Sequence, residues 1–190
     1  MIKRIKNILI SPKNEWEVVV GENTPHLKLF TTYVLPLSLI SAIAAFIGYG
    51  LIGYSVFGIR FHSIQWGVCQ AMVQWLSMVV GVYVTAFVID ILAANFGTKK
   101  DFNKSFSLVA YSYTPVFLSG IFCILPLLSW MSFFVAIYGL FLLFIGLQPM
   151  TKVPAEKKIG YLVVSLVVMF ANLIVLPLIF GAIFHWGTII

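Results

Sequence analysis

Charged residues are scarce in this sequence: Asp, Glu, Lys and Arg make up 9% of its 190 residues. Soluble domains carry about 25%, so this chain lacks the charge needed to cover a surface in water. Apolar residues make up 61% of the chain, and its mean hydropathy is +1.04. The composition excludes a soluble globular domain and predicts a single membrane-embedded domain.

Cysteine is also scarce. Cys69 and Cys123 have no CxxC or metal-ligand spacing around them. Both are expected toward the outer ends of their helices, where a disulfide between them is one interpretation. Two buried free thiols are the other, and the sequence favours them because unpaired cysteine behaves as a small apolar residue.

Catalytic constellations are missing as well. Asp90 is the one carboxylate within an apolar run, so an acidic dyad cannot form in one chain. The three histidines, His26, His62 and His185, are divided between the two expected sides of the membrane, which argues against a metal site or a nucleophile–histidine pair. No glycine-rich phosphate loop is present. The sequence therefore predicts neither an enzyme nor a bound cofactor.

Residues 105–151 contain no Asp, Glu, Lys, Arg or His. As one helix this run would be about 70 Å long, whereas the apolar core of a bilayer is about 30 Å thick. The run must therefore cross, turn and cross back, and Leu125, Pro126 and Leu127 mark the turn. Because lipid cannot satisfy backbone polar groups, each crossing is expected to be a helix.

The chain as a whole predicts an all-α, polytopic membrane protein with five crossings in residues 29–190. The crossings are expected within 29–59 and 64–95, then over about 105–124, 128–147 and 159–184. Pro149 and the polar linker 152–158 are expected to end the hairpin of the third and fourth crossings. Residues 1–28 form a separate N-terminal segment. Apolar residues alternate there with Lys3, Arg4 and Lys6, which is typical of a helix lying on an anionic membrane surface.

The basic residues predict the orientation of the chain. Of twelve Lys and Arg residues, all but Arg60 fall on one side of the predicted bilayer. Cytoplasmic loops retain Lys and Arg, so we expect the N-terminus in the cytoplasm and the C-terminus outside. Trp66, Trp130 and Trp186 are expected at the outer boundary, where indole rings favour the interface. No basic run suits nucleic acid.

Polar residues inside the crossings are the candidate functional residues. Asp90 lies near the cytoplasmic end of the second crossing, where it can reach water or pair with Lys99, Lys100 or Lys104. This position favours a structural role at the interface. An ion or proton site is the alternative, since carboxylates inside a membrane are often functional.

Gln70, Gln74, Ser77, Gly81 and Thr85 share one face of the second crossing because they recur every three or four residues. Such a face usually marks close helix packing, and an aqueous path is the alternative interpretation. Asn172 falls near the middle of the fifth crossing, and we expect its amide to bond to this polar face.

Tyr111, Tyr113 and Pro115 form a Y-S-Y-T-P motif in the third crossing. Proline has no backbone N–H, so Pro115 deprives the carbonyl of Tyr111 of its usual helical partner. The motif predicts a kink that serves packing, with a local polar binding site as the alternative.

The order of these signals resembles the Yip family (Ypt-interacting proteins) of five-helix membrane proteins. The resemblance covers nearly the whole chain and rests on residues 8–16, 33–37, 95–97, 110–115, 138–147 and 152–161. It implies five crossings and a cytoplasmic N-terminus. Eukaryotic relatives act with Rab-type GTPases and carry a long N-terminal region with a D-L-Y-G-P signature. This chain has only residues 1–28 there and no such signature, so it resembles the short prokaryotic type.

The sequence as a whole favours a non-enzymatic protein of the bacterial cytoplasmic membrane that acts as a scaffold or membrane organiser. Its basic cytoplasmic face would meet anionic lipid or a protein partner, through Lys99, Lys100, Lys104, Lys152, Lys157 and Lys158. The alternative is a small transporter or channel, in which a homo-oligomer would use Gln70, Gln74, Asn172 and Asp90.

Overall fold

The computed structural model describes residues 1–56, 59–61 and 63–186 of the chain. His62 and the side chains of Arg60, His185 and Trp186 lie outside this description. Within it, five helical segments are long and apolar enough to cross a membrane. They are His26–Ile52, Ile64–Ala93, Phe102–Ile124, Met131–Thr151 and Glu156–Phe184. The prediction of a five-crossing helical protein is confirmed.

The first span is not a uniform α-helix. It consists of α3 (His26–Leu29), the π-helical η1 (Phe30–Val34), α4 (Leu35–Phe46) and the π-helical η2 (Ile47–Ile52). Pro36 stands in the first turn of α4. Because proline has no N–H and crowds the preceding turn, the wider π-helical turn directly before α4 is a natural way to accommodate it.

A short hairpin joins the first span to the second. β1 (Tyr54–Val56) pairs antiparallel with β2 (Ile59–Phe61), with Ser55 opposite Arg60. The long helix α5 (Ile64–Ala93) follows, and the Ser63 side chain caps its start by accepting a bond from the Trp66 N–H. Gly50 and Gly67 let the first span approach α5 closely, since a Cβ on either would press on the other's backbone.

The third span lies at the centre of the bundle. It is divided into α6 (Phe102–Ser112), α7 (Thr114–Ser119) and the 3₁₀ segment η3 (Gly120–Ile124). In its most apolar 18-residue stretch, 78% of the residues are buried, whereas in that of the fifth span 17% are buried. The third span also has the lowest hydropathy of the five, so its polar side chains find partners among the other helices.

The turn predicted at Pro126 is confirmed, because the 3₁₀ segment η4 (Pro126–Leu128) separates η3 from α8 (Met131–Thr151). The fourth crossing was expected to reach about Leu147, with Pro149 and the linker 152–158 ending the hairpin. Instead, α8 continues through Pro149 to Thr151 and ends where that linker begins, at Lys152. Pro149 removes only one bond in the last turn. The Leu147 carbonyl there accepts from the Thr151 hydroxyl at 2.7 Å. The last helix is α9 (Ala155–Trp186).

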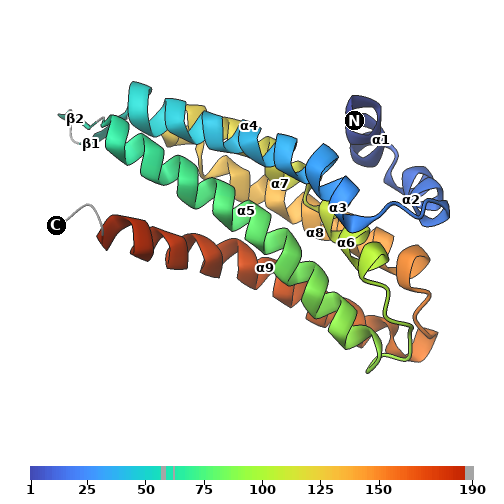
Figure 1. Cartoon of the computed structure of the whole chain (residues 1–190). Coiled ribbons are helices and arrows are strands. Elements are labelled where there is room, and N and C mark those ends of the chain that lie inside the picture. Colours follow the sequence, from blue (N-terminus) through green and yellow to red (C-terminus); the bar gives the residue numbers. More distant parts are fainter. Residues whose placement is uncertain (57–58, 62, 187–190) are drawn as a thin grey trace.

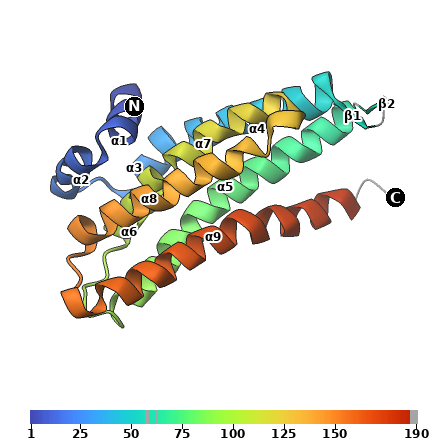
Figure 2. The same cartoon turned by 180° about the vertical axis from the view of Figure 1, so that it is seen from behind.

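The N-terminal segment forms α1 (Ile2–Ile10) and α2 (Pro12–Gly21), which lie at the same end as the α5–α6 and α8–α9 connections (Figures 1 and 2). Both helices pack against the bundle, and Ile8 and Trp16 are fully buried. Tyr138 of α8 donates to the Leu9 carbonyl at 2.7 Å. The segment therefore contributes to the core of the folded chain. The hairpin and the end of α9 lie at the opposite end (Figure 1).

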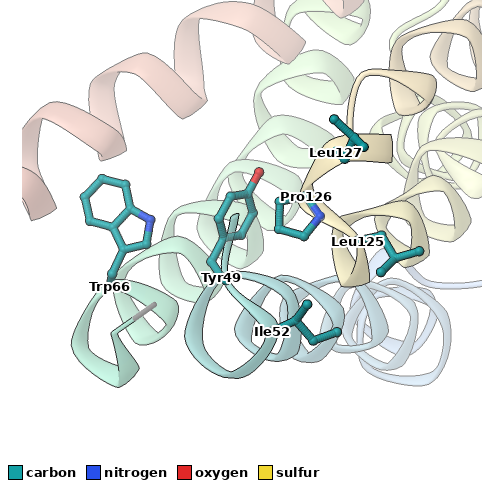
Figure 3. A pocket seen from close by; sticks show the side chains of 7 residues that line it. Tyr49, Ile52, Trp66, Leu125, Pro126 and Leu127 are labelled. Carbon is teal, nitrogen blue, oxygen red and sulfur yellow. The ribbon is translucent and has the colours of Figure 1, made fainter. Parts of the chain in front are cut away.

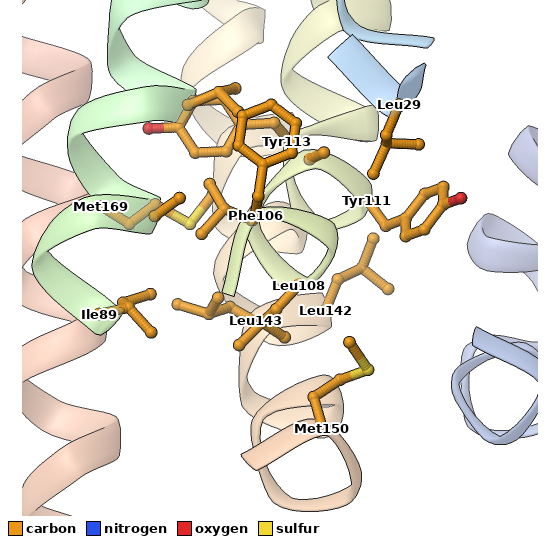
Figure 4. Close-up of a cluster of buried hydrophobic side chains, with 14 of the residues drawn as sticks. Leu29, Ile89, Phe106, Leu108, Tyr111, Tyr113, Leu142, Leu143, Met150 and Met169 are labelled. Atoms are coloured by element: carbon orange, nitrogen blue, oxygen red, sulfur yellow. The ribbon is translucent and has the colours of Figure 1, made fainter. Parts of the chain in front are cut away.

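Figure 4 shows part of the core around α6, with Phe106 and Leu108 of α6 and Leu142, Leu143 and Met150 of α8 among the labelled side chains. Phe106 and the three leucines are fully buried. Burial of one such side chain is worth about 1.5–3 kcal/mol when it is removed from water. Inside a membrane the contribution comes from close packing instead.

Candidate functional site

The α5–α6 and α8–α9 connections enclose a cavity of about 430 Å³ at the N-terminal end of the bundle. Four of the six predicted lysines line it: Lys99, Lys100 and Lys104 from the first connection and helix α6, and Lys152 from the second. Lys152 is far from the other three in the sequence, so only the fold brings it to them.

Backbone geometry holds the two connections next to each other. Gly97 has φ of 76°, a left-handed conformation that glycine adopts freely. The Thr98 hydroxyl donates to the Thr151 carbonyl, which joins one connection to the other. Lys152 is the one described non-glycine residue with positive φ, at 50°, and it caps the end of α8. A lysine in this conformation is strained by about 1 kcal/mol.

The cavity is basic because four lysines and only one acidic residue, Asp101, line it. Asp101 caps α6 by accepting from the Lys104 N–H at 3.2 Å, and the Lys104 ammonium lies 3.6 Å from its other oxygen. The remaining two predicted lysines do not line the cavity. Lys157 reaches the Asn95 carbonyl at 3.4 Å, and Lys158 lies one residue further along α9.

Asp90 joins α5 to the start of α6. Its Oδ1 accepts from the Asp101 N–H at 2.9 Å and from the Ser105 hydroxyl at 3.4 Å. The sequence suggested a lysine partner, but within the described residues no ion pair of Asp90 is found. The carboxylate instead satisfies a backbone donor at the helix start, which is the usual task of a capping acid.

The polar face of α5 meets α9 and the break between α6 and α7. The Asn172 amide donates to the Thr85 hydroxyl at 2.9 Å, and that hydroxyl lies 3.2 Å from the hydroxyl of Tyr113. The predicted bond between Asn172 and this face therefore forms, with Thr85 as its partner. Gln74 lines a second cavity beside these residues, whereas Gln70 does not.

The Y-S-Y-T-P motif breaks the third span as predicted, between α6 and α7. The freed Tyr111 carbonyl accepts from the Thr114 hydroxyl at 2.6 Å. The Thr114 hydroxyl uses its proton in this bond. The Tyr33 hydroxyl therefore donates to the Thr114 oxygen, which lies 2.7 Å away. Figure 4 shows the two tyrosines of the motif pointing opposite ways, with the Tyr113 hydroxyl toward α5 and that of Tyr111 toward the N-terminal helices.

A charged cluster that the sequence did not predict lies beyond Tyr111. The Arg4 guanidinium pairs with Glu15 at 2.7 Å and with Glu22 at 2.5 Å, and its Cζ lies 5.5 Å from the centre of the Tyr111 ring. Asn7 donates to the second Glu15 oxygen at 2.9 Å. Burial acts to lower the pKa of Arg4, but the Glu22 hydrogen bond and the nearby negative charges outweigh it and raise that pKa.

Glu15 is 7% exposed. The one signal in the sequence for its burial was its position, between the residues of α1 and the apolar Trp16. The Arg4–Glu15 pair was hard to predict because it joins residues of two short helices across the turn between α1 and α2.

An apolar cavity of about 510 Å³ lies at the opposite end of the bundle. Tyr49 stands between Trp66 and Pro126 on its wall (Figure 3). Trp66 lies in the first turn of α5 and Trp130 directly precedes α8, so both lie at this end of the bundle. Their place at the outer membrane boundary stays a prediction.

Comparison with known proteins agrees with this architecture. The sequence profile of the Yip1 domain matches residues 6–176. The chain is similar to the inner membrane protein YohC of Escherichia coli K12, and to YohC of Escherichia coli O6:H1 strain CFT073. Each is 28% identical over 156 residues, covering 79% of this chain and 80% of the relative. No solved structure matches. With five helices long and apolar enough to cross a membrane and a family match over residues 6–176, this chain belongs to the Yip1 domain family of integral membrane proteins.

Proposed function

We propose that this chain is a non-enzymatic membrane organiser that binds the headgroups of anionic lipids at the cavity between its α5–α6 and α8–α9 connections. The observation that carries the proposal is the convergence of four lysines on one cavity of about 430 Å³. Lys99 and Lys100 are exposed there, and so is Lys152.

The chemistry of the cavity suits a phosphate group. Ammonium groups bind phosphate as point charges, and each lysine close to an anionic membrane surface contributes about 1 kcal/mol. Asp101 is already engaged as a helix cap, so it leaves three lysines without a close carboxylate among the described residues.

The orientation of the chain is part of the proposal. The basic residues of the connections and of α1 and α2 would face the cytoplasm, where the leaflet is rich in anionic lipid. Single cysteines at Arg60 and Ala155, in a Cys69→Ser/Cys123→Ser background, test this with a membrane-impermeant thiol reagent on intact cells. Labelling of position 60 alone supports the orientation, and labelling of position 155 contradicts it.

Helix packing supports the organiser function over the transporter. Thr85 bonds to both Tyr113 and Asn172 between helices, and Asp90 is held by the start of α6. Asn172 and Asp90, two of the four groups that a transporter would use, are thus engaged in joining helices. Flux of ions or solutes through liposomes containing the purified protein would favour the transporter.

Native mass spectrometry of the purified protein tests the lipid site directly. We expect the wild type to retain phosphatidylglycerol in preference to phosphatidylcholine. The double variant Lys100→Gln/Lys152→Gln removes one lysine from each connection, and should weaken phosphatidylglycerol retention by about tenfold.

The matched control is Lys6→Gln/Lys13→Gln, which removes the same charge from exposed positions on α1 and α2 at the same end of the bundle. This control should keep most of the lipid binding. Equal losses in the two double variants would mean that net charge attracts lipid without a defined site. Equal retention of the two lipids by the wild type would overturn the proposal.

A further inference from the structure

A second cavity, of about 250 Å³, lies at membrane depth between α5, α7, α8 and α9. Its lining carries six hydroxyl groups or amides, which come from four different spans and from none of the loops. Those used here are Gln74 and Ser77 of α5, Tyr113 at the α6–α7 break, and Asn172 of α9. No Asp, Glu, Lys or Arg lines it. This cavity is separate from the lysine-lined one, so neither proposal depends on the other.

The polar and apolar parts of the lining are segregated by depth within the bundle. Tyr113 is 1% exposed and Ser77 is 9% exposed, so hydroxyl groups form the inner wall. Phe133 is 53% exposed and Ile174 is 48% exposed, so apolar side chains form the rim that faces outward. Because these helices cross the membrane, that rim meets lipid acyl chains.

Ser77 shows that the inner wall has unused hydrogen-bonding capacity. Its hydroxyl oxygen is buried and has no hydrogen-bond partner within the described part of the chain. By contrast, the Ser132 hydroxyl on the same lining donates to the Ser119 carbonyl at 2.9 Å. An unpartnered buried hydroxyl is unfavourable, and a carbonyl or hydroxyl entering the cavity would satisfy it.

We propose that this cavity binds the uncharged, hydrogen-bonding head of an amphipathic lipid that enters sideways between the helices. The inner wall would donate to a carbonyl or hydroxyl through Ser77 and Gln74, and the aromatic rim would hold the apolar tail. A charged head is disfavoured because the lining offers no opposite charge to offset its desolvation. A diacylglycerol and an isoprenoid quinone share the required chemistry.

Thermal unfolding of the purified full-length chain measures this binding, because a ligand that binds only the folded state raises the melting temperature with concentration. Four probes distinguish an uncharged head, an apolar tail alone and a charged head: dioctanoylglycerol, decylubiquinone, decane and dioctanoylphosphatidylglycerol. We expect a saturable rise with dioctanoylglycerol or decylubiquinone, and whichever acts identifies the source of the head. Decane tests the tail alone. The charged probe is compared in a Lys100→Gln/Lys152→Gln background, which removes its other binding site.

Two variants locate the site. Gln74→Leu removes the amide at constant size and should weaken binding of the active probe by about tenfold. Its matched control is Gln70→Leu, the same change one turn away on α5 and outside the lining, which should leave binding unchanged. Ala136→Leu fills the cavity without removing a polar group and should also abolish binding.

The melting temperatures without probe report whether each variant is folded. The proposal is overturned if neither uncharged probe produces a saturable rise, or if decane is as effective as either. It is also overturned if Gln74→Leu and Gln70→Leu weaken binding equally, or if Ala136→Leu binds as the wild type does.

Discussion

The indole ring of Trp16 occupies the space that a side chain at Gly146 would need. A Cβ placed on Gly146 would lie 2.5 Å from Trp16 Cε2, and Trp16 is fully buried. The same indole makes an edge-on contact with Tyr111, with ring centres 6.3 Å apart. The N-terminal helices are therefore anchored by an aromatic side chain that fits only because α8 carries a glycine at this point.

Gly146→Ala should displace Trp16 and loosen the N-terminal segment. Overpacking of this kind costs about 1–3 kcal/mol, so we expect a lower melting temperature and faster tryptic cleavage at Lys13. Gly21→Ala is the matched control, because a Cβ there meets nothing within 4 Å. A Gly146→Ala variant as stable and as resistant to trypsin as Gly21→Ala would show that Trp16 does not anchor the segment.

Arg4→Gln should also release the N-terminal segment, because Glu15 would lose its cation while 7% exposed. Removing one partner of a largely buried pair costs about 3 kcal/mol or more, and partial exposure of Glu22 reduces this to about 1–3 kcal/mol. Lys6→Gln is the matched control, an exposed cation on the same helix. Tryptic cleavage at Lys13 measures the release, and equal cleavage of the two variants would contradict the role of Arg4.

The effect of Arg4→Gln should not change between about pH 6 and about pH 9. The pKa of Arg4 is raised, so the stabilisation that this shift represents is fully present below the ordinary arginine pKa. It is lost only as the pH rises through the still higher value in the folded chain. A marked decline of the effect between neutral pH and about pH 9 would contradict this assignment.

Much of this architecture could be predicted from the sequence because the membrane restricts the choices. Residues 105–151 had to form two crossings, and Pro126 marked the turn between them. The break at Pro115 followed from the missing N–H of proline. Asn172 had to find a polar partner at its depth, and Thr85 lies on the polar face that was expected to supply one.

The sites were harder to predict because they join residues with no shared periodicity. Lys152 and Lys99 line the same cavity only because the α5–α6 and α8–α9 connections lie next to each other. Arg4 and Glu15 lie on different short helices, and a pattern within one helix cannot reveal a pair between two. Pro149 was misleading because one lost hydrogen bond in a final turn does not end a helix.

Thr114→Val should destabilise the chain, since it leaves the Tyr111 carbonyl without its donor. We expect a loss of about 1–3 kcal/mol for this buried group. Pro115→Ala restores a backbone N–H four residues after Tyr111, so the double variant should lose less than the sum of the two single changes, by about 1 kcal/mol. Tyr33→Phe/Pro115→Ala is the control pair and should be additive. Additivity of the Thr114 pair would refute the assigned bond.

Lys152→Gly separates charge from strain at the basic cavity. Glycine relieves the left-handed conformation at φ 50° but gains freedom in the unfolded chain, so stability should change by no more than about 1 kcal/mol. Lys152→Val should be less stable, because a β-branched residue is strained at positive φ. Both variants remove one ammonium group and should weaken phosphatidylglycerol retention equally. Unequal retention would mean that the loop conformation, not the charge, determines binding.

Asp90→Asn and Asp90→Leu distinguish a cap from an ion site. The amide oxygen of asparagine can still accept from the Asp101 N–H, which lies 2.9 Å from the carboxylate, so we expect a loss below about 1 kcal/mol. Leucine cannot accept, and the start of α6 then loses its partner at a cost of about 1–3 kcal/mol. Thermal unfolding measures both. If asparagine destabilised the chain as much as leucine does, the negative charge itself would be what α6 requires, and the hydrogen bond would be secondary.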